Sequence, residues 1–239
     1  MIDAYLLKLR ARDAVSEEEE EAIRSLFSEV KEVAADKTVV RAGERLHFSI
    51  MLLDGLLCRY KDLRDGSRQI SELHVAGDFA DLHGFTLKKL DHSVMTLTPC
   101  RIALAPHERI RAVATEHPHL ARLFWLTTNI DAAIHREWVL SLGRRTALAR
   151  VAHLFCELRE RLAIVGLADE TGFELSLTQT DIAECMGLTP VHVNRTLREL
   201  RERGLVEFRS RRVTILDLAG LKRVAEFDPG YLDLEPEPR

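Results

Sequence analysis

The sequence has no long apolar run and no leader-like start. None of its hydrophobic stretches approaches the roughly 18 residues that a membrane-spanning helix needs. The opening stretch, MIDAYLLKLRARD, is interrupted by acids and bases, and no small-residue cleavage site of a secretory signal follows it. These absences predict a cytoplasmic protein that has no membrane partner.

Cysteine is scarce and scattered. The chain has four cysteines and no C-x-x-C pair; they are Cys58, Cys100, Cys156 and Cys185. A disulfide framework is therefore not expected in a cytoplasmic chain of this size. The closely spaced thiolates of structural zinc and iron–sulfur sites are also missing. We expect buried thiols and no metal site.

Neither sign of charge dominates the chain. With 34 basic and 38 acidic residues the formal net charge is −4, which by itself argues weakly against nucleic-acid binding. The 46% hydrophobic and 30% charged residues of this 239-residue chain are typical of one large or two modest globular domains, and they exclude disorder over most of it. Residues 195–212, however, hold seven Arg against three Glu. Phosphate binding responds to such a local field; a solvated helix face is the alternative.

The N-terminal half has the pattern of a small antiparallel β domain. A first helix is predicted over 16–31, with Ser16 as its N-cap and an acidic first turn. From 38 to about 105, turn signals recur about every 11 residues between short β-prone runs, at Asp54-Gly55, Asp65-Gly66 and Gly77-Asp78. This spacing predicts an antiparallel sandwich or barrel.

A long helical pattern follows over 107–141, with Pro118 near its start. Spacings of three and four residues form a coiled-coil seam through Leu120, Leu123, Thr127, Ile130 and Ile134. A second stripe, seven residues apart, comprises Leu126, Ala133 and Leu140. A helix that is apolar on two faces must bury both, so we expect one face to pack on its own barrel and the other on a partner. We assign the homodimer interface to Leu123, Thr127, Ile130 and Ile134; a single buried helix is the alternative.

Two further features divide the rest of the chain. Ser141 and Gly143 are expected to interrupt the long helix and to form a hinge, after which an amphipathic helix resumes over 144–162. The segment after Asp228, DPGYLDLEPEPR, is rich in proline and acids, so we expect it to be disordered.

Residues 176–205, SLTQTDIAECMGLTPVHVNRTLRELRERGL, predict a helix-turn-helix. Thr178 precedes a short helix, Gly187 supplies the tight turn, and Thr189 caps a second helix that begins at Pro190. One face of the second helix is apolar, with Val193, Thr196, Leu197 and Leu200; the opposite face carries Val191, Arg195, Arg198 and Glu202. A two-stranded wing is expected over LVEFRSRRVTIL, with Arg209, Arg211 and Arg212 at its tip. This arrangement is typical of DNA reading; an ordinary helical hairpin is the alternative.

From about 17 to 218 the chain resembles the Crp/Fnr transcription regulators. The most specific part is LTQTDIAECMGLTPVHVNRTLRELRERGLV, supported by RAGE at 41–44 and AGDFADLHGF at 76–85. The resemblance implies an α+β fold. It comprises a double-stranded β-helix (jelly roll) effector domain with an N-terminal helix over 1–117, a dimerisation helix and hinge over 118–143, a winged helix-turn-helix over 144–218 and an acidic tail over 219–239. It also implies a homodimer that binds two-fold, double-stranded operator DNA, works with RNA polymerase and is not an enzyme.

The resemblance assigns roles within the second helix. Arg195 matches the family's terminal recognition arginine, whereas Val191 stands where the family has a base-reading glutamate. The candidate DNA-binding residues are Thr178, Thr189, Pro190, Val191, His192, Asn194, Arg195, Arg198, Arg209 and Arg211.

The resemblance also bears on the effector. Members that bind cyclic AMP carry a glutamate for the ribose and an arginine-serine pair for the phosphate. Here Asp81 stands near the glutamate position and His92-Ser93 at the arginine-serine position. Arginine binds phosphate bidentately and is always charged, whereas histidine is mostly neutral at pH 7, so cyclic AMP is not the expected effector. The candidate pocket residues are His74, Asp78, Asp81, His83, His92 and Ser93.

Two other kinds of sensor and one rival class of protein use residues of the types found here. Some relatives bind haem, which a pocket histidine would suit, and the oxygen-sensing members use N-terminal cysteines, which are missing before Cys58. The rival is a jelly-roll small-molecule-binding protein or metalloenzyme with a helical dimerisation domain. Its H-x-H signature occurs at His117 and His119, but no carboxylate follows within the next few residues. We therefore predict no enzyme and no bound cofactor, with an unknown effector.

Overall fold

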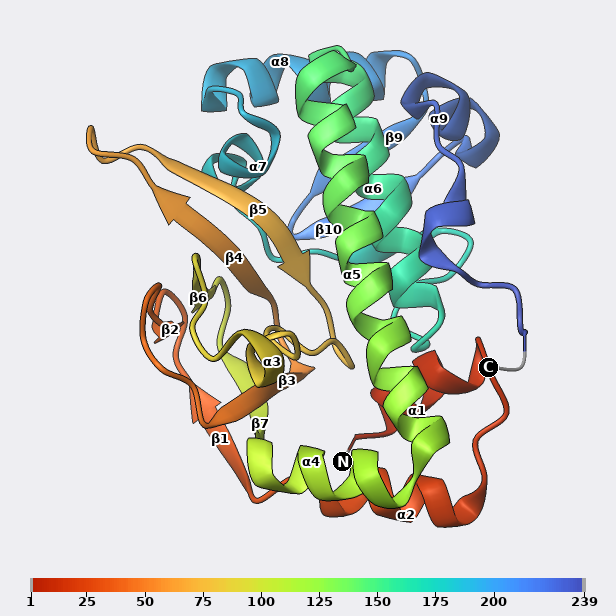
Figure 1. The fold of residues 1–239 in the computed structure, drawn as a ribbon. Helices are drawn as coiled ribbons and strands as arrows, with labels where there is room; N and C mark the ends of the chain where they lie inside the picture. The colour runs from red at the N-terminus through yellow and green to blue at the C-terminus, as the bar shows by residue number, and fades with distance from the viewer. Residues whose placement is uncertain (1, 238–239) are drawn as a thin grey trace. The chain divides into compact units, whose positions relative to one another are not determined.

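The computed structural model describes residues 2–237 (Figure 1). These residues form two compact units, each of which is described by itself. The first unit comprises the chain up to Tyr60, Leu73–Ala132 and the residues from Asp233 on, and the second comprises Lys61–Glu72 and Ala133–Leu232. The chain passes from one unit to the other within a β-hairpin and within one long helix.

Two antiparallel sheets form the centre of the first unit. One has the order β1–β7–β3 and the other β2–β6–β4–β5. The strands are β1 (Glu29–Val33), β2 (Thr38–Val40), β3 (Phe48–Asp54), β4 (Leu57–Asp62), β5 (Arg68–His74), β6 (Ser93–Thr96) and β7 (Cys100–Pro106). The end of β4 and most of β5, which lie within Lys61–Glu72, belong to the second unit. Side chains from both sheets pack in one apolar cluster that includes Ile50, Leu57, Val94 and Ile102. The predicted antiparallel β domain is confirmed, with the two-layer core that alternating strands produce.

The turn between β3 and β4 requires its glycine. Gly55 has a φ of +94°, and a Cβ at this position would lie 2.5 Å from the carbonyl oxygen of Pro99. Both the left-handed backbone and the close approach exclude a side chain here. The Asp54-Gly55 signal in the sequence therefore marks a turn for a physical reason.

Four shorter helices belong to the first unit: α1 (Asp3–Arg10), α2 (Glu17–Ser25), α3 (Gly84–Leu87) and α4 (His107–Glu116). The predicted cap of α2 is confirmed, because the Ser16 hydroxyl accepts from the Glu19 amide and the Glu19 carboxylate accepts from the Ser16 amide at 2.9 Å. The predicted end at residue 31 is wrong. The helix ends at Ser25, and Val30 lies in β1, where pairing with β7 overrides the helical spacing.

Helix α5 (Pro118–Arg144) begins at the predicted proline, but it is not interrupted at 141–143. Ser141 is buried, and Gly143 is helical with open space around it. A helical glycine costs only about 1 kcal/mol, which is too little to break a packed helix. The break lies instead at 145–146, where Thr146 adopts an extended conformation and its hydroxyl caps α6 (Ala147–Ala163).

The second unit is built around α6. Its other elements are β8 (Gly172–Glu174), α7 (Gln179–Met186), α8 (Pro190–Glu202), β9 (Val206–Arg209), β10 (Arg212–Ile215), α9 (Leu218–Ala225) and the 3-10 turn η1 (Pro229–Leu232). A small antiparallel sheet has the order β8–β10–β9. Strand β8 adds to the two-stranded wing that the sequence predicts, because Phe173 pairs with Val213 in the middle of the sheet.

The prediction of a disordered segment after Asp228 is wrong for the residues that the structure describes. Leu232 is fully buried, the Tyr231 hydroxyl donates to Glu157 at 2.9 Å, and the Tyr231 ring stacks on His153. Two apolar anchors in a polar segment are enough to order it once buried partners exist, and composition does not reveal those partners. Residues 238 and 239 lie outside the described residues.

All four cysteines are buried free thiols, as predicted. No helix within residues 2–237 is long and apolar enough to cross a membrane.

Candidate nucleic-acid interface

The helix-turn-helix begins with a well-capped helix. Thr178 and Asp181 form a reciprocal capping box at the start of α7, with the Thr178 amide donating to Asp181 at 2.7 Å. Gly187 ends α7 with a φ of +61°, a left-handed conformation that favours glycine. The next helix starts three residues later, so the predicted helix-turn-helix is confirmed.

Helix α8 has the predicted cap and core face. The Thr189 hydroxyl accepts from the His192 amide at 3.3 Å, and Pro190 is the first helical residue. Val193, Thr196 and Leu200 are buried. The core stripe therefore fixes which face of α8 points outward.

The outer face of α8 combines one apolar and one charged side chain at its N-terminal end. Val191 is 68% exposed, although it is a large apolar residue. Arg195 is exposed one turn later and forms no ion pair within residues 2–237. Asn194 donates to the Gln179 side chain at 3.3 Å, whereas Arg198 is bound to Glu202 at 2.7 Å. Val191, His192 and Arg195 are thus exposed without a polar side-chain partner in residues 2–237, and Val191 and Arg195 lie one turn apart on the outer face.

The arginines of the wing also differ in whether a carboxylate pairs with them. The turn between β9 and β10 consists of Ser210 and Arg211, with φ values of +50° and +62°, the pattern of a tight two-residue hairpin. Arg209 pairs with Glu207 at 3.0 Å, whereas Arg211 at the tip forms no ion pair within the described chain. The seven arginines in residues 195–212 are therefore not equivalent. Those that are paired with a carboxylate must break that ion pair before they can bind a phosphate.

The six candidate effector residues have different surroundings in the structure. His83 and His92 lie together, with ring centroids 5.4 Å apart. The Asp78 carboxylate binds Lys8 at 2.5 Å, Ser93 accepts from the Ala42 amide at 3.1 Å, and His74 is buried. These contacts are structural, because they hold loops and strand ends of the β domain.

The Asp81 carboxylate is held by a hydrogen bond from the backbone of β3. Its Oδ1 accepts from the Ile50 amide at 2.6 Å, and its Oδ2 has no hydrogen-bond partner in residues 2–237. Burial raises the pKa of Asp81 to about 7, against the opposing effect of the Ile50 amide and of the Arg59 charge. The carboxyl group of Asp81 therefore titrates near neutral pH although it is buried.

Arg59 is the residue of the effector domain that sequence reasoning missed. It is only 2% exposed, its Nε donates to the Ala80 carbonyl at 2.8 Å, and its guanidinium donates to Asp131 on α5 at 2.7 Å. The space left beside these residues, which His83 also lines, is about 10 Å³. The sequence does contain a signal for the burial of Arg59. Side chains alternate along a strand with a period of two, so Arg59 lies on the same face as the core residue Leu57.

The predicted dimer residues require a correction. Leu123 and Ile134 are only 0% and 5% exposed within the single chain, so a partner cannot reach them. The Thr127 hydroxyl donates to the Leu123 carbonyl, and Ile130 is half-buried. The exposed positions of α5 instead repeat at spacings of three and four: Arg122, Trp125, Asn129, Ala132, Arg136 and Val139. The seam predicted through Leu123 and Ile134 therefore lies on the face that the chain itself buries, and these exposed positions belong to neither predicted stripe.

Of the two H-x-H histidines, His119 is held by two carboxylates. Both ring nitrogens of His119 face carboxylates, with Nδ1 2.7 Å from Glu19 and Nε2 3.2 Å from Asp13. Burial alone would lower the pKa of His119, but its bonds to Glu19 and Asp13 raise it. This histidine thus ties α5 to the N-terminal segment and leaves no ring nitrogen for a metal.

Comparisons with known proteins agree with this architecture. Residues 30–117 match the family described as a cyclic nucleotide-binding domain, and residues 149–224 match the Crp-like helix-turn-helix domain. The chain is 30% identical over 229 residues to the transcriptional activator protein FnrL of Cereibacter sphaeroides, covering 93% of this chain and 90% of that one. It is also 30% identical over 175 residues to the nitrogen fixation regulation protein FixK of Azorhizobium caulinodans, covering 73% and 70%.

A solved structure has the same fold. FixK2 of Bradyrhizobium japonicum aligns with a TM-score of 0.75 at 24% identity, covering 82% of this chain and 96% of that one. A β domain of the cyclic-nucleotide-binding type followed by a winged helix-turn-helix defines a class of sensor-linked DNA-binding regulators. The chain belongs to the Crp/Fnr family of transcription regulators. It is a DNA-binding transcription regulator and not an enzyme.

Proposed function

We propose that the protein is a homodimer that reads a two-fold operator and inserts the first turns of α8 into the major groove of each half-site. The observation that carries the proposal is the outer face of α8, where exposed Val191 lies one turn before Arg195, which has no ion-pair partner within residues 2–237. The N-terminal end of the second helix is the part of a helix-turn-helix that contacts base edges. The relatives named as transcription regulators support the same role.

Arg195 and Val191 read different base pairs in this proposal. A guanidinium binds guanine O6 and N7 bidentately, worth about 1–3 kcal/mol of discrimination. Valine has no acceptor for cytosine N4, so it makes apolar contact, best with a thymine methyl group. His192 and Asn194 flank these two residues and contact phosphates. The half-site therefore keeps a guanine and prefers or tolerates thymine at the neighbouring position.

Selection of binding sites from random duplexes tests the base assignments. Arg195→Ala should lose the guanine preference, and Val191→Glu should replace thymine by cytosine at the neighbouring position. Arg203→Ala is the matched control, because this exposed arginine is already paired with Glu199 at the far end of α8. An unchanged sequence with Val191→Glu would mean that Val191 does not face a base.

We further propose that the dimer forms through the exposed face of α5. Trp125 and Val139 are each 70% exposed, and Leu140 is exposed beside Val139. The exposed positions of this face recur at spacings of three and four, and Trp125 and Val139 lie two heptads apart on it, which is typical of a coiled-coil seam. Two copies of this face pack against each other in the proposed dimer.

We infer that cyclic AMP is not the effector. Arg59 and Asp131 occupy the space between the β domain and α5, and Asp81 is engaged by the Ile50 amide. Titration calorimetry with cyclic AMP should give no binding heat, while a cyclic-AMP-binding member of the family serves as the positive control. Saturable binding to the wild-type protein would contradict the inference.

RNA polymerase is the proposed partner on DNA, in the cytoplasm. The printed names of the relatives include a transcriptional activator, which supports this partner. Transcription in vitro from a promoter that carries the selected operator should change when the protein is added. Equal transcript levels with and without the protein, at concentrations that occupy the operator, would remove RNA polymerase from the proposal.

A further inference from the structure

Side chains from outside the helix-turn-helix hold the last turn of α7. Helix ends leave backbone carbonyls without intrahelical partners. The Gln69 side-chain amide donates to the carbonyls of Glu184 and Cys185, at 2.7 and 3.2 Å. Arg150 of α6 donates to the Met186 carbonyl at 2.9 Å. The three final carbonyls of the helix are thereby satisfied.

Gln69 comes from a distant part of the sequence. It lies on β5, in the hairpin that β4 and β5 form, and this hairpin runs beside α7 (Figure 1). Its Nε2 also donates to the Ile70 carbonyl at 2.8 Å, which fixes the orientation of the amide. Its Oε1 lies 3.8 Å from the position that a Cβ on Gly187 would take. One side chain thus borders both the end of α7 and the turn that leads to α8.

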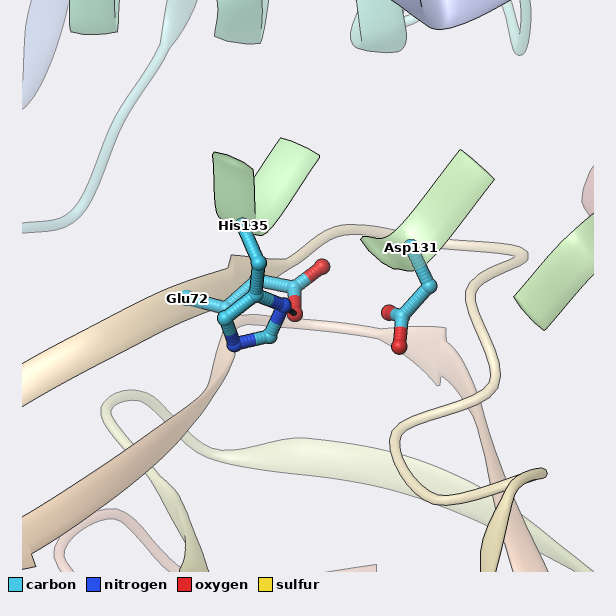
Figure 2. A group of neighbouring side chains, drawn as sticks. All are labelled: Glu72, Asp131 and His135. Atoms are coloured by element: carbon cyan, nitrogen blue, oxygen red, sulfur yellow. Dashed lines mark ion pairs between the residues drawn. The ribbon is translucent and has the colours of Figure 1, made fainter. Parts of the chain in front are cut away.

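Strand β5 has a second contact, which it makes with α5. Glu72, three residues after Gln69, is buried, and its carboxylate lies 3.0 Å from Nδ1 of His135 on α5. Figure 2 shows this pair, with Asp131 one helical turn earlier on α5. Strand β5 is therefore tied to α7 by Gln69 and to α5 by Glu72, within one compact unit.

We propose that the β4–β5 hairpin braces the helix-turn-helix and that Gln69 is a positioning residue for DNA binding. It acts through the last turn of α7 on the start of α8, so the inference rests on the proposed function of α8 in reading DNA. The site requires a donor, because the C-terminal end of a helix presents carbonyl oxygens and a partial negative charge. A side chain that only accepts would repel these carbonyls.

Three substitutions at Gln69 separate charge from size. At pH 8, operator affinity should follow the order Gln69→Lys close to wild type, then Gln69→Met, then Gln69→Glu. Lysine keeps donors and suits the helix dipole, methionine keeps the length but loses the donor, and glutamate adds repulsion. We expect a loss of about threefold to tenfold for methionine and more than about tenfold for glutamate, as for one or two lost hydrogen bonds.

Amide hydrogen exchange gives a readout that does not depend on DNA. The Leu188 amide donates to the Ala183 carbonyl at 3.0 Å and should exchange faster in the same order of variants. Sequence selection should return the wild-type operator for every variant, because a positioning residue contacts no base. Leu63→Ala, at an exposed position of the same hairpin, is the matched control and should change neither quantity.

The outcomes distinguish the brace from the proposed function. If exchange and affinity follow the predicted order, the positioning role is supported. Unchanged exchange in all three variants overturns the brace, and altered exchange with unaltered affinity overturns the positioning role. If the wild-type protein selects no operator, the proposed reading of DNA fails, and the exchange order alone then supports or overturns the brace.

Discussion

Asp81 is a carboxylic acid enclosed by the first unit. It is fully buried, one of its oxygens has no partner within residues 2–237, and burial raises its pKa to about 7. The folded protein therefore keeps a proton on Asp81 that the unfolded chain releases above its ordinary pKa of 3.8. The protonation of this buried carboxyl group is thereby coupled to the stability of the fold.

The free energy of unfolding should fall as pH rises because of Asp81. Its contribution is fully present below pH 3.8 and is lost as the pH rises through about 7. The difference between 3.8 and about 7 corresponds to roughly 4 kcal/mol, at 1.36 kcal/mol per pKa unit. Urea unfolding at pH 5 and pH 8 should show a smaller loss for Asp81→Asn than for the wild type, and the variant should be the more stable protein at pH 8.

All other titrating groups are the same in the wild type and in Asp81→Asn. The difference between their losses of stability therefore reports on Asp81. Asp65→Asn is a suitable control, because hydrogen bonds from Ser67 lower the pKa of this exposed carboxylate. It should not reduce the loss of stability between pH 5 and pH 8. Equal losses in wild type and Asp81→Asn would show that Asp81 is ionised in the folded protein at both values.

Helix α5 carries two different faces along its length. Leu123 and Ile134 lie on the face that is buried in the chain, and Trp125 and Val139 lie on the exposed face. Both faces repeat at spacings of three and four, so periodicity alone cannot tell which one packs on the same chain. The contacts of the β domain with the helix decide it, because they cover Leu123 in an apolar cluster.

A double variant, Val139→Asp with Leu140→Asp, should sediment as a monomer. Charges on an apolar dimer seam are unpaired and desolvated in the dimer, whereas both positions are exposed in the single chain. The stability of the monomer should therefore change by less than about 0.5 kcal/mol per site, the range for surface substitutions. Operator affinity should fall at least tenfold, since two half-sites are no longer bound together.

Two comparisons sharpen the dimer experiment. Leu167→Asp, at an exposed apolar position outside α5, should remain dimeric. Ile134→Asp should unfold the protein rather than dissociate it, because the residue is buried in the single chain. A double variant at Val139 and Leu140 that stays dimeric would place the interface on another surface.

Gly143 offers a separate test of helix continuity. It is helical, and no atom lies within 4 Å of the position that a Cβ would take. Gly143→Ala should therefore stabilise the protein by about 0.5–1 kcal/mol, because alanine loses less backbone freedom on folding. A rise in the urea midpoint with unchanged operator affinity is expected; a changed affinity would instead indicate that the helix bends here in function.

The C-terminal segment completes the second unit. The buried carboxylate of Glu157 on α6 accepts from Trp138 of α5 at 3.0 Å, from Arg161 at 2.8 Å and from the Tyr231 hydroxyl at 2.9 Å. Its bonds therefore join the C-terminal part of α5, α6 and η1. A buried carboxylate needs such donors, because the loss of one leaves a costly unpaired group.

Tyr231→Phe should destabilise the second unit by about 1–2 kcal/mol, the cost of one hydrogen bond to a buried charged group. Removal of residues 227–239 should lower the free energy of unfolding further, because it also uncovers the His153 ring. The centroids of the His153 and Phe227 rings are 5.1 Å apart. Urea unfolding followed by tryptophan fluorescence measures both effects. The exposed Glu235→Ala variant is the control, and a stability of Tyr231→Phe equal to that of wild type would mean that Glu157 needs no third donor.

The sequence predicted the DNA-reading half well because its signals are local. A cap at Thr178, a left-handed glycine at Gly187 and a cap at Thr189 each act within a few residues, so the helix-turn-helix can be derived without knowing the rest of the fold. The effector half depends on contacts between distant residues. Arg59 and Asp131 are 72 residues apart, and although strand alternation indicates that Arg59 faces inward, nothing in the sequence indicates Asp131 as its partner.

The sequence by itself determined the family, the order of β domain, long helix and winged helix-turn-helix, and the outer residues of α8, because its signals of propensity, capping and turn chemistry are local. Only the tertiary structure decided which face of α5 is covered, that Arg59 occupies the space beside Asp131, that the C-terminal segment is ordered, and that Gln69 contacts α7. Each of these depends on burial of one group by another far along the chain. Burial is a property of the packed molecule, and no single stretch of sequence contains it.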